Sequence, residues 1–145
     1  KLAIYGSDIL ESQQRKAFVN LRSAGLEGCV EVVRADLLEL RAPATAGVLV
    51  ANPPYGVRLS DTSELEAFYP KLGDALKAHW AGWRCYFFTG DPALPKGVRL
   101  KASKRTPLFN GAIECRLFEY QMIAGSARKP KPADNAAGQD PLPTD

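Results

Sequence analysis

The sequence predicts an α/β protein built on a parallel sheet. Short apolar runs alternate with segments of helical periodicity, and several of these runs end at a polar residue. The central run, 47–51, is continuous and rich in Val and Leu, as buried parallel strands are, and it stops at Asn52-Pro53-Pro54. Proline cannot donate to a sheet ladder. Because open α/β sheets bind ligands at the carboxyl ends of their strands, we expect a functional site at Asn52.

The first third of the chain is expected to form a strand, a helix and a second strand. Residues 1–8 are predicted to form a strand, because 2–5 are apolar and the run ends at Gly-Ser-Asp. Apolar residues at helical spacing predict a helix over 10–24, with Gly25 as its C-terminal stop. The β-branched run 30–34 predicts the next strand.

Each of these two strands is followed by an aspartate. A carboxylate at a strand end can accept hydrogen bonds from two vicinal ribose hydroxyls, which is one interpretation of Asp8; the other is a cap for the next helix. Asp36 could receive the amino group of an adenine ring, with Leu37 or Leu38 beside it, or it could begin a solvated turn. The residues alone leave both pairs of alternatives open.

A second helix is expected after the central motif. Ser63 and Glu66 form a capping box, and an apolar stripe follows at spacings of three and four residues: Leu65, Phe68, Leu72 and Leu76. Pro70 predicts a kink or a new first turn. His79, the only histidine, has no metal-ligating neighbour at suitable spacing and is interpreted as a surface or helix-end residue.

The last ordered elements are expected to be an aromatic strand and a hairpin. The run 83–89 is rich in aromatic residues, and 112–123 reads as a strand that follows an Asn110-Gly111 turn. The segment 96–105 holds five basic residues and no acidic one. It could contact RNA phosphates, or it could be a solvated edge strand protected by its charges.

Composition sets broad limits. The 145 residues are 46% hydrophobic and 24% charged with a net charge of +3, as in a soluble globular domain. No apolar run approaches the roughly 20 residues of a membrane span, and the N-terminus does not resemble a signal peptide. Three isolated cysteines argue against a disulfide framework or a zinc site, so we expect no metal and a cytoplasmic location. Residues 125–145 hold four prolines and no aromatic residue, which predicts a disordered tail after a domain at 1–124.

The central motif has a specific chemical use. In a turn stiffened by Pro53 and Pro54, the Asn52 side-chain oxygen and the Pro53 carbonyl can converge as two acceptors on one NH2 group. Tyr55 offers a flat face on which a base can stack, worth roughly 1–3 kcal/mol. Catalysis by such a site is mainly positioning of the amine against an electrophile. The alternative is a proline turn with a capping Asn.

Asn52-Pro53-Pro54-Tyr55-Gly56 resembles the signature of S-adenosylmethionine enzymes that methylate exocyclic amines, in the form typical of RNA methylases. The order of the remaining features, over residues 1–123, resembles the catalytic domain of the bacterial 23S ribosomal RNA guanine-N2 methyltransferases. Full-length members carry an N-terminal THUMP RNA-binding domain. The resemblance implies a class I (Rossmann-like) methyltransferase sheet with a C-terminal antiparallel hairpin.

The resemblance also implies roles for particular residues. S-adenosylmethionine is the implied cofactor and 23S ribosomal RNA the implied partner. The catalytic set is Asn52, Pro53, Pro54 and Tyr55. The cofactor set is Asp8 for the ribose, Asp36 for the adenine amine, and Ile9, Leu37 and Asn52. The expected RNA-binding residues are Arg58, Lys101, Lys104, Arg105 and Asn110. The target base must be flipped, because a paired amine is already occupied.

One feature of the family is missing. Its first strand ends in a glycine-rich loop against the cofactor, whereas this chain has no Gly-x-Gly before Asp8 or elsewhere. In the family strand order, 3-2-1-4-5-7-6, that strand separates the one at Leu2 from the one at Gly47. We therefore expect this chain to be the C-terminal portion of a longer protein, with a THUMP-like domain and the first cofactor motif upstream.

Two other functions fit the same motif. DNA adenine-N6 and protein glutamine methyltransferases share the four-residue signature, so either is an alternative enzyme. The second class is a non-catalytic remnant that keeps the fold and binds RNA. Intact Asn52 and Tyr55 argue against long disuse of the site.

Overall fold

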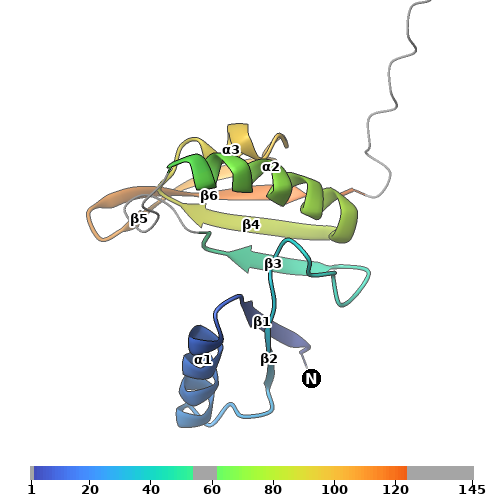
Figure 1. The fold of residues 1–145 in the computed structure, drawn as a ribbon, viewed down its shortest axis with the longest axis vertical. Coiled ribbons are helices and arrows are strands. Elements are labelled where there is room, and N and C mark those ends of the chain that lie inside the picture. Colours follow the sequence, from blue (N-terminus) through green and yellow to red (C-terminus); the bar gives the residue numbers. More distant parts are fainter. Residues whose placement is uncertain (1, 54–61, 124–145) are drawn as a thin grey trace, which may run out of the picture.

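The computed structural model describes residues 2–53 and 62–123, and it contains two groups of strands with helices packed on them (Figure 1). Along the chain the elements are β1 (Ile4–Asp8), α1 (Glu11–Ser23), β2 (Val30–Arg34), β3 (Gly47–Ala51), α2 (Thr62–His79), β4 (Trp83–Thr89), α3 (Leu94–Gly97), β5 (Lys104–Asn110) and β6 (Ile113–Gln121). The expected tail at 125–145, with Pro54, Tyr55 and Arg58, lies outside the described residues.

The strands form two sheets. β1 and β2 pair in parallel, and the larger sheet has the order β3-β4-β6-β5. β3 and β4 are parallel, whereas β6 runs antiparallel to both β4 and β5. Laid end to end, the two sheets reproduce the predicted strand order, with the position of the missing strand falling between β1 and β3. The predicted α/β fold with a C-terminal hairpin is confirmed.

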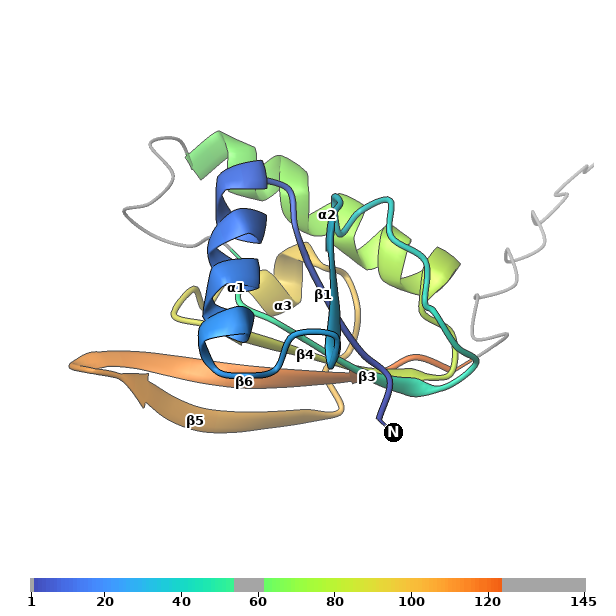
Figure 2. The same ribbon diagram turned by 90° about the horizontal axis from the view of Figure 1, so that it is seen from below.

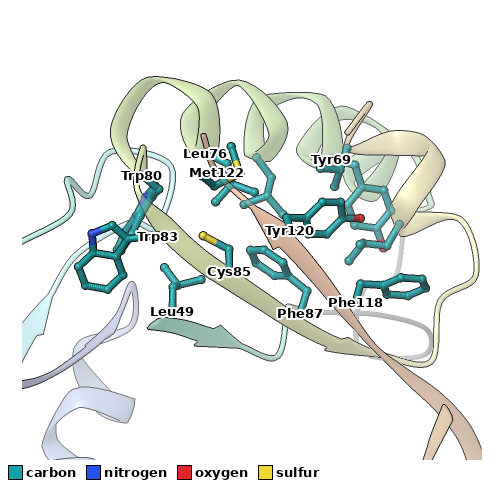
Figure 3. Close-up of a cluster of buried hydrophobic side chains, with 13 residues drawn as sticks. Leu49, Tyr69, Leu76, Trp80, Trp83, Cys85, Phe87, Phe118, Tyr120 and Met122 are labelled. Carbon is teal, nitrogen blue, oxygen red and sulfur yellow. The ribbon is translucent and has the colours of Figure 1, made fainter. Parts of the chain in front are cut away.

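The core lies between the larger sheet and the helices α2 and α3, which cover one face of that sheet (Figure 2). The side chains at its centre come from alternate positions of β4 and β6, because successive residues of a strand point to opposite faces. Figure 3 shows Cys85 and Phe87 of β4 beside Phe118 and Tyr120 of β6, under Leu76 of α2. Burial of such side chains contributes roughly 1.5–3 kcal/mol each.

Two positions in this layer have no room for a side chain, which explains why both are glycine. A Cβ on Gly73 of α2 would come within 2.0 Å of the backbone oxygen of Val98, which follows α3. A Cβ on Gly47 would come within 2.6 Å of the Trp83 indole ring. The indole nitrogen of Trp83 in turn donates to the Ala44 carbonyl at 2.8 Å. The segment before β3 is thereby fixed to the start of β4.

The prediction of a parallel strand at 47–51 is confirmed, but its expected burial is wrong for one of its two faces. Leu49 points into the core, but Val48 and Val50 are 60% and 70% exposed on the other face. The physical reason is that α2 covers one face only, and no described element covers the other. β1 is similar, with Ile4 48% exposed and Tyr5 52% exposed. Both sheets therefore present apolar side chains to solvent within the described residues.

Smaller expectations differ from the structure in detail. α2 begins at Thr62 and runs through Pro70 without a new start, so the expected capping box does not mark the first residue of the helix. The hairpin turn is Gly111-Ala112, one position later than expected, because Asn110 still pairs with Ile113. Gly111 has a φ of 61°, which glycine adopts at little cost.

No helix in the described ranges is long and apolar enough to cross a membrane.

Candidate active site

The predicted site residues lie where strands end, and the arrows of β1, β3 and β4 point to the same side of the molecule (Figure 1). β1 ends at Asp8, and β2 ends at Arg34, two residues before Asp36. β3 ends at Ala51, directly before Asn52. The sequence prediction that these residues follow strands is confirmed, and their roles remain predictions.

Asp8 and Asp36 each use one carboxylate oxygen locally. Oδ1 of Asp8 accepts from the Leu10 backbone N–H at 2.8 Å at the start of α1, and Oδ1 of Asp36 accepts from the Leu38 N–H at 2.9 Å. The backbone N–H of Ala35 donates to the Asp8 carbonyl and ties the two strand ends together. Asp36 thus begins a turn, as one of its two interpretations has it, whereas Asp8 bonds the N–H of Leu10, the N-cap residue of α1, and α1 has no side-chain cap. Among the described residues, the second carboxylate oxygen of each aspartate has no hydrogen-bond partner.

The neighbours of these aspartates supply apolar surface. Ile9 is 56% exposed, and Leu37 is half-buried and packs against the core cluster. Asp8 also lines an open cavity of about 670 Å³ between α1 and the β1–β2 pair. Ile9, Asp36 and Leu37 are not among the residues that line this cavity.

The end of β3 carries Asn52 and Pro53, the residues predicted to hold the target amine. The register sets Ala51 beside Phe87, so Asn52 and Pro53 come next to the end of β4. Asn52 is exposed, while Pro53 is buried. Because Pro53 is buried directly after exposed Asn52, the backbone that carries the Asn52 side chain is held in place. Pro54 and Tyr55, the other half of the catalytic set, lie outside the described residues.

A hydrogen-bond network holds the turn after β4. The hydroxyl of Tyr69, on α2, donates to Oδ2 of Asp91 at 2.5 Å, and Oδ1 of Asp91 accepts from the Ala93 N–H at 2.8 Å. The Asp91 N–H donates to the hydroxyl oxygen of buried Thr89 at 3.0 Å. Burial and the adjacent Asp91 carboxylate raise the pKa of Tyr69 well above its ordinary value, so the hydroxyl stays a donor. The turn is therefore anchored to α2.

The predicted RNA-binding residues are spread over the hairpin. Lys104 pairs across β6 with Glu119, and Arg105 pairs with Phe118, with its guanidinium 5.9 Å from the ring centroid. Successive strand residues face opposite sides, so Lys104 and Arg105 lie on different faces. Lys101 precedes β5, Asn110 ends it, and both are exposed. Arg58 is not among the described residues.

Sequence reasoning missed a cavity at the end of β4. It has a volume of about 250 Å³ and is lined by Thr89, Gly90, Asp91, Pro92, Glu114, Cys115, Arg116 and Phe118. The available signal was the alternation of Glu114, Arg116 and Phe118 at the start of a strand, which brings all three to one face.

The described ranges contain no group of three metal-ligating side chains. The three cysteines are free thiols, exposed at Cys29 and buried at Cys85 and Cys115.

This strand order, with polar residues at the carboxyl ends of β1, β2 and β3, defines the class I methyltransferase fold. The solved structure described as "SMU.472, a putative methyltransferase complexed with SAH" superposes with a TM-score of 0.78 at 29% identity, over 83% of this chain and 32% of that one. A predicted N6-adenine-specific DNA methylase from Listeria monocytogenes gives a TM-score of 0.70 at 28% identity, over 82% and 30%.

The family is defined by sequence. Residues 1–119 match the model UPF0020, described as RMKL-like, methyltransferase domain, and the chain belongs to that family. A curated relative, Ribosomal RNA large subunit methyltransferase K/L of Shewanella baltica, is 39% identical over 132 residues, which are 91% of this chain. The matched part is 19% of the relative, so the chain spans about a fifth of its length.

Proposed function

We propose that this chain is part of an S-adenosylmethionine-dependent methyltransferase that acts on an exocyclic amine of a base in RNA, with guanine N2 in 23S ribosomal RNA as the target. The observation that carries the proposal is the position of Asn52-Pro53 at the carboxyl end of β3. Ligands of open α/β sheets bind at that edge. The ribosomal RNA activity in the name of the 39% identical relative supports RNA as the substrate.

The cofactor would be held from the β1–β2 side. Asp8 and Asp36 each keep one carboxylate oxygen outside the local turn, so Asp8 can accept from ribose hydroxyls and Asp36 from an adenine amine. Ile9 and Leu37 would flank the ring. The family's fold and an SAH-bound structural relative support this assignment.

The amine would be held from β3. The Asn52 side-chain oxygen and the Pro53 carbonyl accept the two N–H groups, which directs the nitrogen lone pair away from both acceptors and toward the methyl donor. When bound, S-adenosylmethionine supplies an electrophilic methyl group on a positively charged sulfur. Asn52 and Pro53 would hold the amine in place while its nitrogen takes the methyl group from that sulfur, and the amine would then give its extra proton to water.

A strand from outside this chain would complete the site. Within the described residues, β1 pairs only with β2 and β3 only with β4, so each keeps one open edge. Exposed Val48 and Val50 on β3, and Ile4 on β1, are the apolar surface that a further strand and its helix would cover. We propose that this strand, together with a THUMP-like RNA-binding domain, belongs to the complete protein.

The test of the amine site is Asn52→Ala in the protein as its complete gene encodes it. Methyl transfer should fall at least about a hundredfold, since transition-state positioning is lost. RNA affinity should stay nearly unchanged, because phosphate contacts supply most of it. Arg15→Ala, at an exposed position on α1, is the matched surface control. Unchanged turnover in Asn52→Ala would remove the role given to this residue.

The Listeria relative, described as a DNA methylase, is the observation that favours a second candidate, adenine-N6 methylation of DNA. Methyl incorporation into ribosomal RNA, DNA and release-factor protein, measured side by side, separates the proposed substrate from DNA and from protein glutamine. A non-catalytic RNA-binding remnant would label none of the three.

A further inference from the structure

We propose that the tip of the β5–β6 hairpin, residues 108–113, contacts RNA beside the flipped target base, and that the Phe109 ring stacks on an unpaired base there. This inference rests on the proposed function, because it assigns a further contact to the same RNA. It concerns nucleotides next to the target and leaves the amine site at Asn52 as described.

The hairpin tip holds a group of exposed apolar side chains. Phe109 is 71% exposed, Ile113 is 55% exposed and Leu108 is 40% exposed. All three lie close to the turn at Gly111, where an added Cβ would meet no heavy atom within 4 Å. A single exposed apolar side chain is common, but several at the end of one hairpin indicate contact with a partner.

The tip is apolar on both faces. Successive strand residues point to opposite faces, so Leu108 and Ile113 share the face of Val48 and Val50, whereas Phe109 points to the other face. Such a tip suits insertion among splayed bases, which offer flat surfaces on either side. Sequence-specific RNA recognition uses unpaired bases that stack on aromatic side chains.

The charge of the hairpin also favours RNA as the partner. Between the end of α3 and the end of β6 there are five basic residues and two acidic ones. Of the acidic residues, Glu114 is paired with Arg116 at 2.9 Å, and Glu119 is the cross-strand neighbour of Lys104. Exposed Lys101 and Lys104 form no ion pair with any described residue. Basic side chains without a protein partner are available to phosphates.

The tip lies at the same edge of the sheet as Asn52. β6 is antiparallel to β4, and its first residues, 113–115, extend past the end of β4 (Figure 2). Continuation of the register sets Asn52 level with Leu117 of β6. Phe109 of β5 is opposite Glu114, three residues further out.

These positions give the distance between the two contacts. The rise is about 3.4 Å per residue, and β5 is three strand spacings of about 4.8 Å from β3, so Phe109 lies about 18 Å from Asn52. Stacked nucleotides rise about 3.4 Å each, so this distance corresponds to about five nucleotides. The Phe109 ring therefore contacts a neighbour of the target and not the target itself.

The test measures the affinity of the protein, as its complete gene encodes it, for unmodified 23S ribosomal RNA. Phe109→Leu keeps an apolar side chain but removes the flat ring, so affinity should fall at least about fivefold, as for the loss of one stacked base. Phe109→Trp keeps a stacking surface and should bind within about twofold of the wild type.

Salt dependence separates stacking from phosphate contact. Phe109→Leu removes no charge and should leave the slope of log affinity against log salt unchanged. Lys104→Ala should make that slope shallower by about one, as expected for one lost phosphate contact. Phe18→Leu, at a 51% exposed phenylalanine on α1, is the matched control and should change neither affinity nor slope.

Abasic sites identify the stacked base once the methylated position has been mapped. They are placed one at a time within about five nucleotides of that position, in a synthetic fragment of the RNA. One of them should weaken binding by the wild type and leave binding by Phe109→Leu unchanged, because the ring that it stacks on is already absent.

The outcomes distinguish this inference from its foundation. Wild-type affinity in Phe109→Leu overturns the RNA contact while the proposed function stands, and a lowered melting temperature in that variant would then place the tip against another part of the protein. Equal effects of every abasic site on both proteins overturn the stacking role of Phe109. A wild-type protein that methylates DNA or protein but no ribosomal RNA overturns both proposals.

Discussion

Two buried tyrosines with opposite hydrogen-bond status predict opposite effects of the same substitution. Tyr120 is 1% exposed, and within the described residues its hydroxyl has no hydrogen-bond partner. A buried unpaired polar group costs about 1–3 kcal/mol. Tyr120→Phe keeps the edge contact with Phe87, at 6.0 Å between centroids, and removes the hydroxyl. We expect the free energy of unfolding to rise by about 1 kcal/mol or more.

Tyr69→Phe is the matched comparison. The Tyr69 hydroxyl donates to the Asp91 carboxylate, and hydrogen bonds to charged groups contribute about 1.5–3 kcal/mol. Its removal should lower the free energy of unfolding by about that amount and loosen the turn after β4. Both side chains are buried and both changes delete one oxygen, so the difference in sign isolates the hydrogen bond.

The measurement is urea unfolding followed by the fluorescence of Trp80 and Trp83, which both lie in the core. A second signature is pH dependence. Burial raises the pKa of Tyr120 from its ordinary value of 10.0 to about 12. Above pH 10 the tyrosine ionises more readily in the unfolded state than in the folded state. The free energy of unfolding is therefore unaffected by this group below pH 10 and falls as the pH rises toward 12. Tyr120→Phe should lack this part of the alkaline loss. A destabilised Tyr120→Phe protein would refute the reasoning.

Three further results are expected. Burial raises the pKa of the Cys85 thiol to about 12, so at pH 8 a thiol reagent should modify exposed Cys29 quickly and Cys85 only after unfolding; rapid modification of Cys85 would contradict its burial. Gly73→Ala should destabilise the protein by several kcal/mol, because its Cβ would overlap the Val98 carbonyl, and an unchanged melting temperature would contradict that packing. The isolated 145 residues should bind S-adenosylmethionine poorly or not at all; micromolar binding in calorimetry would show that no outside strand is needed.

Much of the fold could be predicted because local patterns and tertiary packing agree. The run 83–89 became β4 with the expected bounds, and 30–34 became β2. The burial of β3 could not be predicted from its apolar run, because burial depends on the elements that cover each face. The sequence of β3 is that of a two-sided buried strand, and only one of its faces is covered by described residues.

The candidate site was predictable only where a short motif carries the chemistry. Asn52-Pro53 is contiguous and interpretable by itself, as are the aspartates that follow β1 and β2. The cavity at the end of β4 combines residues 89–92 with Glu114 and Arg116, and their proximity follows from the antiparallel pairing of β4 and β6. No single-sequence pattern specifies which strands become neighbours.

The open edges of β1 and β3 have a consequence during synthesis. If the complete protein supplies the proposed strand upstream of this chain, that strand remains unpaired while the ribosome makes β1, α1, β2 and β3, and the sheet forms late. During that interval the edge of β3 is unpaired, and the exposed side chains of Val48 and Val50 add apolar surface on the adjacent face of the sheet. Aggregation during overexpression should therefore depend on whether the completing segment is made in the same polypeptide.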